Sequence, residues 1–129
     1  MQLKAYASLV GQEITIETAK DVLRNAGTRE QRAITVDGIL RAVSGMYNVK
    51  VSDLRGARKH KALSYPRQQA MYLARKLTGL SYPEIGQRLG GKDHSTVIYA
   101  ERKIQDRLEK DPELRRTLTA LEEIARQKS

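Results

Sequence analysis

Gly90-Gly91-Lys92-Asp93-His94-Ser95-Thr96-Val97-Ile98-Tyr99-Ala100 is the most informative stretch of this 129-residue chain. Its glycine pair predicts a sharp turn, after which Asp93 is expected to cap a new helix by accepting hydrogen bonds from free N–H groups. The first turn of that helix holds three short polar residues able to reach base edges in a major groove, His94, Ser95 and Thr96. Its later turns carry an apolar stripe and outward cations: Val97, Ala100, Ile104 and Leu108, with Arg102, Lys103 and Arg107 outside. This pattern is typical of a helix that lies on DNA.

The preceding residues complete a helix-turn-helix pattern. Ser81-Tyr82-Pro83-Glu84 has the form of a capping box and predicts a short helix over 82–89, in which Gly86 permits a close approach by the next helix. Together with the turn 90–92 and the helix 94–108, this is the spacing of a helix-turn-helix. A helical hairpin in any small α-domain shares that outline, so the spacing alone does not establish DNA binding.

Helical periodicity dominates the whole chain, and we predict an all-α fold with two parts: a helical leader over 1–33 and a helical domain over 34–129. The leader is expected to hold helices over 3–11 and 15–25. In the domain we expect a helix capped by Thr35, a single turn capped by Ser52 or Asp53, a helix opened by Pro66 that ends at Gly79, and a last helix begun by Asp111-Pro112. The inward residues are expected to be Ile39, Leu40, Val43, Tyr47, Ala70, Leu73, Ala74, Leu77, Leu114, Leu118, Leu121 and Ala125.

Charge is concentrated beside the expected helix-turn-helix. The chain has a formal net charge of +9, and residues 55–83 contain seven Lys or Arg and no Asp or Glu. Such a local positive field favours a polyanion, most often a phosphodiester backbone, although a solvated basic face is the commoner explanation of an isolated charge run. Its position just before the expected DNA helix favours the polyanion.

Particular contacts follow from this arrangement. Arg67 and Gln68 are expected at a helix start after a basic loop over 56–63, where helix N–H groups attract phosphate. Lys59 and its neighbours in that loop could enter a minor groove. Asp93 could accept from a cytosine amino group besides capping its helix. Two further cations, Lys61 and Lys92, are expected to contact phosphates.

Enzyme chemistry finds no support in the sequence. A GxxxxGK[ST] phosphate loop is absent, and two histidines, His60 and His94, without any cysteine make no persuasive metal site. We therefore expect no catalytic residues and no cofactor. No apolar run is long enough to cross a bilayer and the N-terminus has no signal pattern, so we expect a cytoplasmic, nucleoid-associated protein.

The run GGKDHSTVIYA resembles the motif of the bacterial replication initiator family DnaA, and the resemblance extends through Ser64–Met71 (SYPRQQAM), Leu80–Gly86 (LSYPEIG) and Arg102-Lys103-Ile104. It covers roughly residues 34–126, the family's C-terminal DNA-binding domain, and implies a Trp-repressor-like helix-turn-helix. The leader is similar to the end of the family's AAA+ lid and its connecting helix. The resemblance implies that the chain is an excised piece of a longer protein, whose ATP-binding motifs lie upstream, so that ATP is a cofactor only there.

The resemblance also implies a function. Family members bind asymmetric nine-base-pair origin boxes of the TTATnCACA type, one domain per box. Carried over residue by residue, Asp93, His94 and Ser95 read the major groove with Pro83 at the thymine-rich side. Phosphates are held by Arg67, Gln68, Thr96 and Lys103. One loop side chain enters the minor groove, either Arg58 or Lys59, because this chain has lysine where the family usually has arginine; likewise Ser95 replaces a common threonine.

Two other interpretations stay open. The chain could be a protein-interaction module through which regulatory proteins cover the DNA-binding face. It could also associate with a membrane surface through its basic segment and leader. The family resemblance implies a contact with acidic phospholipids near the junction of lid and DNA-binding domain, for which the amphipathic stretch over 28–47 is a candidate.

Overall fold

The computed structural model describes residues 33–129, and the elements of that part are all helices: α3 (Val36–Tyr47), α4 (Val51–Arg55), α5 (Lys61–Thr78), α6 (Tyr82–Arg88), α7 (His94–Leu108) and α8 (Pro112–Lys128). The all-α prediction is therefore confirmed. The leader helices predicted over 3–11 and 15–25 lie outside the described residues.

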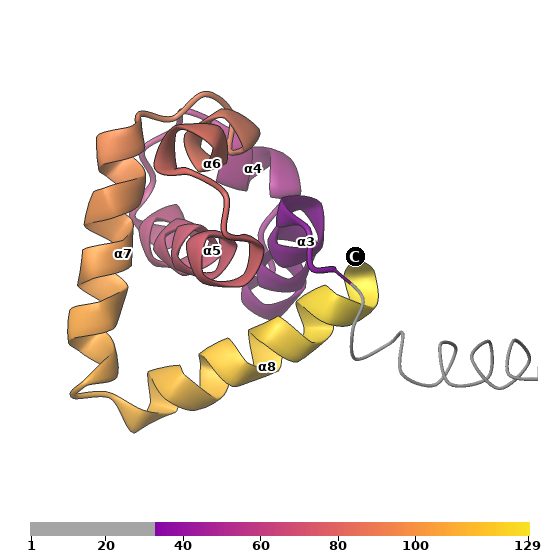
Figure 1. Cartoon of the computed structure of the whole chain (residues 1–129), viewed down its shortest axis with the longest axis vertical. Helices are drawn as coiled ribbons and strands as arrows, with labels where there is room; N and C mark the ends of the chain where they lie inside the picture. The colour runs from indigo at the N-terminus through magenta and orange to yellow at the C-terminus, as the bar shows by residue number, and fades with distance from the viewer. Residues whose placement is uncertain (1–32) are drawn as a thin grey trace, which may run out of the picture. The chain divides into compact units, whose positions relative to one another are not determined.

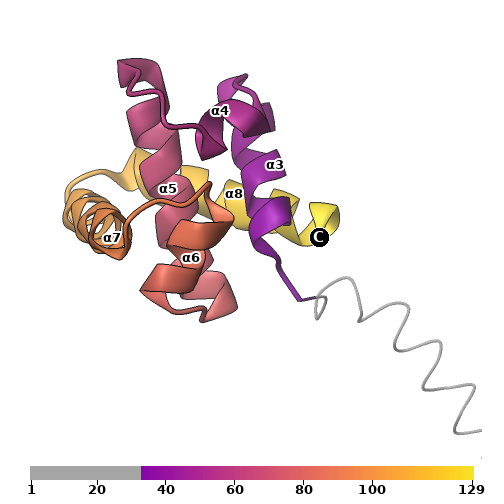
Figure 2. The same cartoon turned by 90° about the horizontal axis from the view of Figure 1, so that it is seen from above.

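Helix α5 is the centre of the fold. Figure 1 views it almost end-on, with α7 and α8 on two sides of it and α3, α4 and α6 on the others. In the view from above, α7 is seen almost end-on beside α5, while α8 passes behind α5 and α3 (Figure 2). Helices α3 and α8 pack on each other, as do α5 and α7. Most of the apolar side chains expected from periodicity are buried, among them Ile39, Leu40, Val43, Leu73, Ala74, Leu114 and Leu121. Two of the expected set, Tyr47 and Leu77, are only partly buried.

The cap predicted at Thr35 is confirmed, and α8 begins at Asp111-Pro112 as predicted. Thr35 Oγ1 accepts from Gly38 N at 3.0 Å, and Asp111 Oδ1 accepts from Leu114 N at 3.3 Å at the start of α8. Each bond satisfies an N–H group that the first helical turn leaves without a partner in the helix. Helix α4 differs, because Lys50 stands at its N-cap and no side chain caps it, so the cap predicted from Ser52 or Asp53 is wrong.

Helix α5 begins five residues earlier than predicted. Proline is best tolerated in a first turn, and for that reason the start was expected at Pro66. In the structure His60 is the N-cap and its Nδ1 accepts from Ala62 N at 3.2 Å. Leu63, in the added turn, is buried with 6% of its surface exposed. The cap and this burial favour the longer helix, and the basic loop shrinks from the predicted 56–63 to 56–60.

The turn between α6 and α7 follows the glycine pattern. Gly90 and Gly91 have φ angles of +87° and +82°, a region that other residues enter at a cost. A close approach does occur at Gly86, but it is made by the turn and not by the next helix as predicted: a Cβ there would lie 2.0 Å from Lys92 O. Ser81 Oγ accepts from Glu84 N at 3.3 Å, which is half of the predicted capping box. The Glu84 carboxylate pairs with Arg88.

Candidate nucleic-acid interface

The first turn of α7 is polar and open to solvent. Asp93, His94, Ser95 and Thr96, which we call the α7 tip, are all exposed. The next residues turn inward: Val97, Ala100 and Ile104 have at most 1% of their surface exposed. The stripe therefore holds α7 on the core while its N-terminal end projects, as the sequence predicts.

Asp93 stands at the N-cap of α7, but its carboxylate makes no cap hydrogen bond. It accepts from Ser95 Oγ at 3.2 Å and lies 3.2 Å from His94 Nδ1. The predicted side-chain cap is thus wrong, because the carboxylate binds the neighbouring side chains instead of the backbone. These contacts orient three predicted base-reading groups relative to one another while all three stay accessible.

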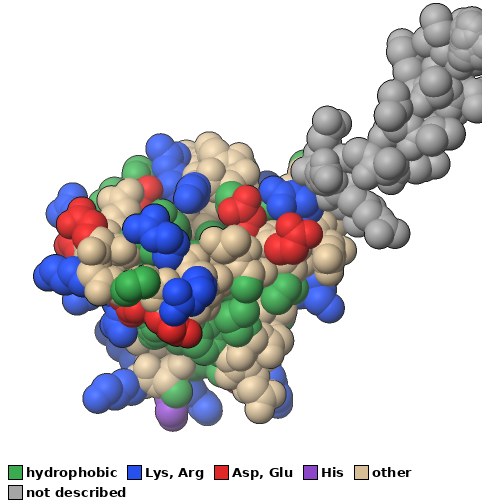
Figure 3. All heavy atoms as spheres, turned by 90° about the horizontal axis from the view of Figure 1, so that it is seen from below, with side chains coloured by type: hydrophobic (Ala, Val, Ile, Leu, Met, Phe, Trp, Pro, Cys, Tyr) green, Lys and Arg blue, Asp and Glu red, His purple; other side chains and the backbone are tan. Residues whose placement is uncertain are grey.

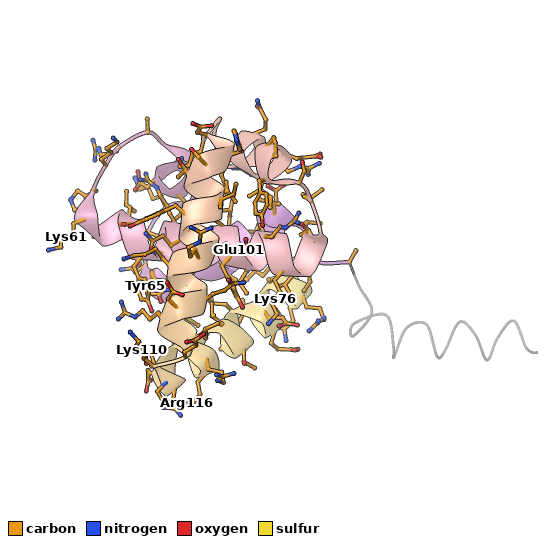
Figure 4. All side chains as sticks on the ribbon, turned by 60° about the vertical axis from the view of Figure 1, so that its left-hand side comes forward. Lys61, Tyr65, Lys76, Glu101, Lys110 and Arg116 are labelled. Carbon is orange, nitrogen blue, oxygen red and sulfur yellow. The ribbon has the colours of Figure 1, made fainter. Side chains whose placement is uncertain are left out.

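A short basic loop lies beside the α7 tip. The α4–α5 loop, residues 56–60, carries Arg58 and Lys59, and Lys61 opens α5; all three side chains are exposed. Figure 4 shows Lys61 projecting from the end of α5 that lies next to this loop. In the space-filling view from below, basic and acidic side chains are interspersed over the upper part of the face, whereas its lower end shows Lys or Arg and a histidine (Figure 3).

A cleft of about 680 Å³ separates the loop from the α7 tip. Its lining comes from the α4–α5 loop, from α5, from the turn 90–92 and from α7, and includes Lys59, Gln68, Asp93, Thr96 and Tyr99. The structure thus gathers residues that lie far apart in the sequence around one concave surface with cations on its rim.

Arg67 does not occupy the position predicted for it. It lies in the interior of α5, 9% exposed, and not at a helix start. Its guanidinium donates to the carbonyls of Leu54 at 3.2 Å, Arg58 at 2.6 Å, Asp53 at 2.5 Å and Gly56 at 3.1 Å. Burial lowers the pKa of Arg67, and Asp53 partly offsets that. One of the five N–H donors is left for any phosphate.

Lys92 is likewise turned inward. Its ammonium donates to the carbonyls of Arg55 at 3.1 Å, Gly56 at 2.8 Å and Leu89 at 2.9 Å. Burial lowers the pKa of Lys92, and the nearby charge of Arg67 lowers it further. Since an ammonium has three N–H donors, these bonds account for all of them, and the geometry gives no support to a phosphate contact by Lys92.

The other predicted contacts lie at the surface. Pro83, at the start of α6, and Lys103 are exposed, and Gln68 is half-buried in the cleft wall. Sequence reasoning missed Tyr99, which is 56% exposed and lies with its ring 5.8 Å from Lys103 Nζ. The helical spacing of Thr96, Tyr99 and Lys103 could have placed it on the same face.

Three observations bear on the alternative functions. Within residues 33–129, His, Cys, Asp and Glu nowhere form a group of three that could hold a metal ion, and none of the helices is long and apolar enough to span a membrane. The stretch over 28–47 expected to meet lipid overlaps α3, whose apolar residues Ile39, Leu40 and Val43 are fully buried in the protein core.

Comparison with known proteins identifies the fold's relatives. The family model described as "Bacterial dnaA protein helix-turn-helix" matches residues 36–104. Three similar curated proteins carry the name chromosomal replication initiator protein DnaA. Those from Geotalea daltonii, Geobacter sulfurreducens and Cereibacter sphaeroides are 43%, 44% and 42% identical over 92%, 94% and 95% of this chain.

The chain spans about a quarter of the length of these relatives, 26% to 27%. The matched residues include α6, the turn 90–92 and most of α7. The resemblance inferred from GGKDHSTVIYA is confirmed: the chain belongs to the bacterial DnaA family and contains its helix-turn-helix.

Proposed function

We propose that this chain binds double-stranded DNA sequence-specifically, with the α7 tip in the major groove. The observation that carries the proposal is the division of α7 into an exposed polar first turn and a buried apolar stripe. A helix anchored in this way can press short polar side chains against base edges without exposing apolar surface. The relatives' name, chromosomal replication initiator protein, favours a role in starting bacterial chromosome replication.

Each surface group has an expected role. Asp93, His94 and Ser95 read bases in the major groove, with Pro83 beside the thymine-rich part of the site. Arg58 or Lys59 enters the adjoining minor groove from the α4–α5 loop. Phosphates are held by side chains around these two regions: Thr96, Lys103, Lys61 and Gln68. Phosphate contacts fix the register of the protein on the duplex, and base contacts supply the preference.

The site that fits this reading is an asymmetric nine-base-pair origin box of the TTATnCACA type, bound by one copy of the chain. The carboxylate of Asp93 suits the amino group of a cytosine within CACA. The His94 ring and the Ser95 hydroxyl, both exposed next to it, suit the neighbouring base edges.

The test is fluorescence anisotropy with a labelled box duplex and a scrambled duplex of the same composition, across a salt series. We expect the chain to bind the box more tightly. Asp93→Ala and His94→Ala should each cost about 1–3 kcal/mol on the box and much less on the scrambled duplex. Gln105→Ala, an exposed change on the same helix three turns from the tip, is the matched control.

Equal affinity of the unchanged chain for both duplexes would overturn the proposal. Equal losses on both duplexes for Asp93→Ala and His94→Ala would remove direct base reading by the tip, even if DNA binding remained. Acidic vesicles as a competitor address the lipid interpretation, because a sequence reader should keep its box in their presence at moderate salt.

A further inference from the structure

The α4–α5 loop and the helix-turn-helix are joined through one carbonyl. Gly56 O accepts from Arg67 Nη2 at 3.1 Å and from Lys92 Nζ at 2.8 Å. Arg67 belongs to α5 and Lys92 to the turn before α7. Two cations from different parts of the fold therefore converge on the first residue of the loop.

The backbone supports the same junction. A Cβ at Gly90 would lie 1.9 Å from Arg55 O, so the turn 90–92 packs directly on the end of α4. Arg55 O also accepts from Lys92 Nζ at 3.1 Å. In the middle of the loop, Arg58 O accepts from Arg67 Nη1 at 2.6 Å. The start and the middle of the loop are thus tied to side chains that it does not itself supply.

Holding two like charges here is costly. Burial lowers the pKa of both groups, and the charge of Arg67 lowers the pKa of Lys92 further. The protonated ammonium of Lys92 is therefore less stable at this place in the fold than it would be in water, and repulsion by the charge of Arg67 adds to that cost. What the two cations supply in return is a set of strong, directional bonds to the loop carbonyls.

We propose that Arg67 and Lys92 are positioning residues that fix the α4–α5 loop against the turn 90–92, so that the loop and the α7 tip meet a duplex at a set spacing. The inference rests on the proposed function. Because the loop is ordered before binding, Arg58 or Lys59 reaches the minor groove without the entropic cost of ordering a free loop. Contacts in the two grooves are then made together.

The test compares Lys92→Met with Lys61→Met. Methionine keeps much of the length of the lysine stem and removes the donors, and Lys61 is an exposed lysine on the neighbouring helix. Lys61→Met should lower the slope of log affinity against log salt by about 0.9, as expected for one lost phosphate contact. Lys92→Met should weaken binding to the box while leaving that slope unchanged.

A double-mutant cycle supplies the readout that a merely structural role would not move. The loop variant, Arg58→Ala with Lys59→Ala, should weaken binding to the box about tenfold in the unchanged chain and only about twofold in the Lys92→Met background. Lys92→Gln, which keeps two N–H donors, should give an intermediate coupling. Far-UV circular dichroism checks that every variant retains its helices.

Amide hydrogen exchange on the DNA-free chain tests the same inference independently. Lys92→Met should speed exchange in residues 56–60 and leave α8 unchanged. Unchanged exchange in the loop would overturn the inference, as would a full tenfold loop effect in the Lys92→Met background or a salt slope lowered by about one. Loss of box preference in the unchanged chain would instead overturn the proposed function, and hydrogen exchange would still show whether Lys92 holds the loop.

Discussion

The α4–α5 loop and the turn 90–92 are two short connections that line the same cleft, yet their shapes are held in different ways. The turn is held by its own backbone: Gly86 O accepts from Gly91 N at 3.0 Å and from Lys92 N at 2.8 Å, next to two glycines with positive φ. The loop is held by the side chains of Arg67 and Lys92, which lie nine or more residues after the loop carbonyls that they bind. One connection is encoded locally and the other by distant residues.

Gly90→Ala should break the locally encoded connection and have the largest effect. Its Cβ would meet Arg55 O at 1.9 Å, and its φ of +87° is strained for alanine. We expect the free energy of unfolding to fall by about 3–4 kcal/mol, as measured by urea denaturation.

Gly91→Ala is the matched control for that change. Its φ of +82° is nearly the same, but a Cβ there has no neighbour within 4 Å. The strain alone should cost about 1–2 kcal/mol. Equal losses at the two positions would show that the contact with the end of α4 contributes nothing.

Arg67→Met should loosen the other connection. It removes donors to the four carbonyls between residues 53 and 58. We expect the free energy of unfolding to fall by about 2 kcal/mol, because some of those carbonyls regain bonds to water while buried ones do not. Arg102→Met, an exposed change on α7, should stay within about 0.5 kcal/mol by the same denaturation. An Arg67→Met loss no larger than that would mean that the loop needs no side chain to hold it.

The same contrast explains what could be predicted from the sequence. The turn 90–92, the stripe Val97–Ala100–Ile104, the cap at Thr35 and the start of α8 at Asp111-Pro112 depend on residues within a few positions of one another, and all were predicted correctly. The candidate contacts at the α7 tip belong to this group in their position and exposure, and their roles stay predictions.

The errors arose where tertiary contacts decide. Arg67 reads as a phosphate ligand after a basic run, and only the folded chain reveals that α4 and the loop present four carbonyls to it. Asp93 reads as a helix cap, but His94 and Ser95 take its carboxylate. In both cases the charge was read correctly, but the partner was not deducible from sequence spacing, and for Arg67 the expected place at a helix start was also wrong.

Lys103, an exposed cation near the cleft, should contribute to DNA binding in a different way from Arg67 and Lys92, whose side chains point inward. Lys103→Met should lower the salt slope of box binding by about 0.9 and keep the preference over scrambled DNA, because a phosphate contact carries no sequence information. The measurement is the anisotropy salt series. Lys128→Met makes the same change at the C-terminal end of α8, which Figure 1 places on the other side of the domain from α7, and should leave the slope unaltered. A lowered slope for both would indicate a general charge effect.

Arg116→Ala should have the smallest effect and set the outer limit of the interface. Arg116 Nη2 lies 2.8 Å from Glu113 Oε1, and both side chains are more than two-thirds exposed. Solvent screens such a pair, so the free energy of unfolding should change by less than about 0.5 kcal/mol. Figure 4 places Arg116 at the far end of the domain from the α4–α5 loop, so the salt slope of box binding should also stay the same. A slope lowered by about one unit would instead extend the DNA footprint along α7 to the start of α8. The position of the domain on the duplex would then be fixed by three parts of the fold, the start of α8 as well as the α4–α5 loop and the turn 90–92.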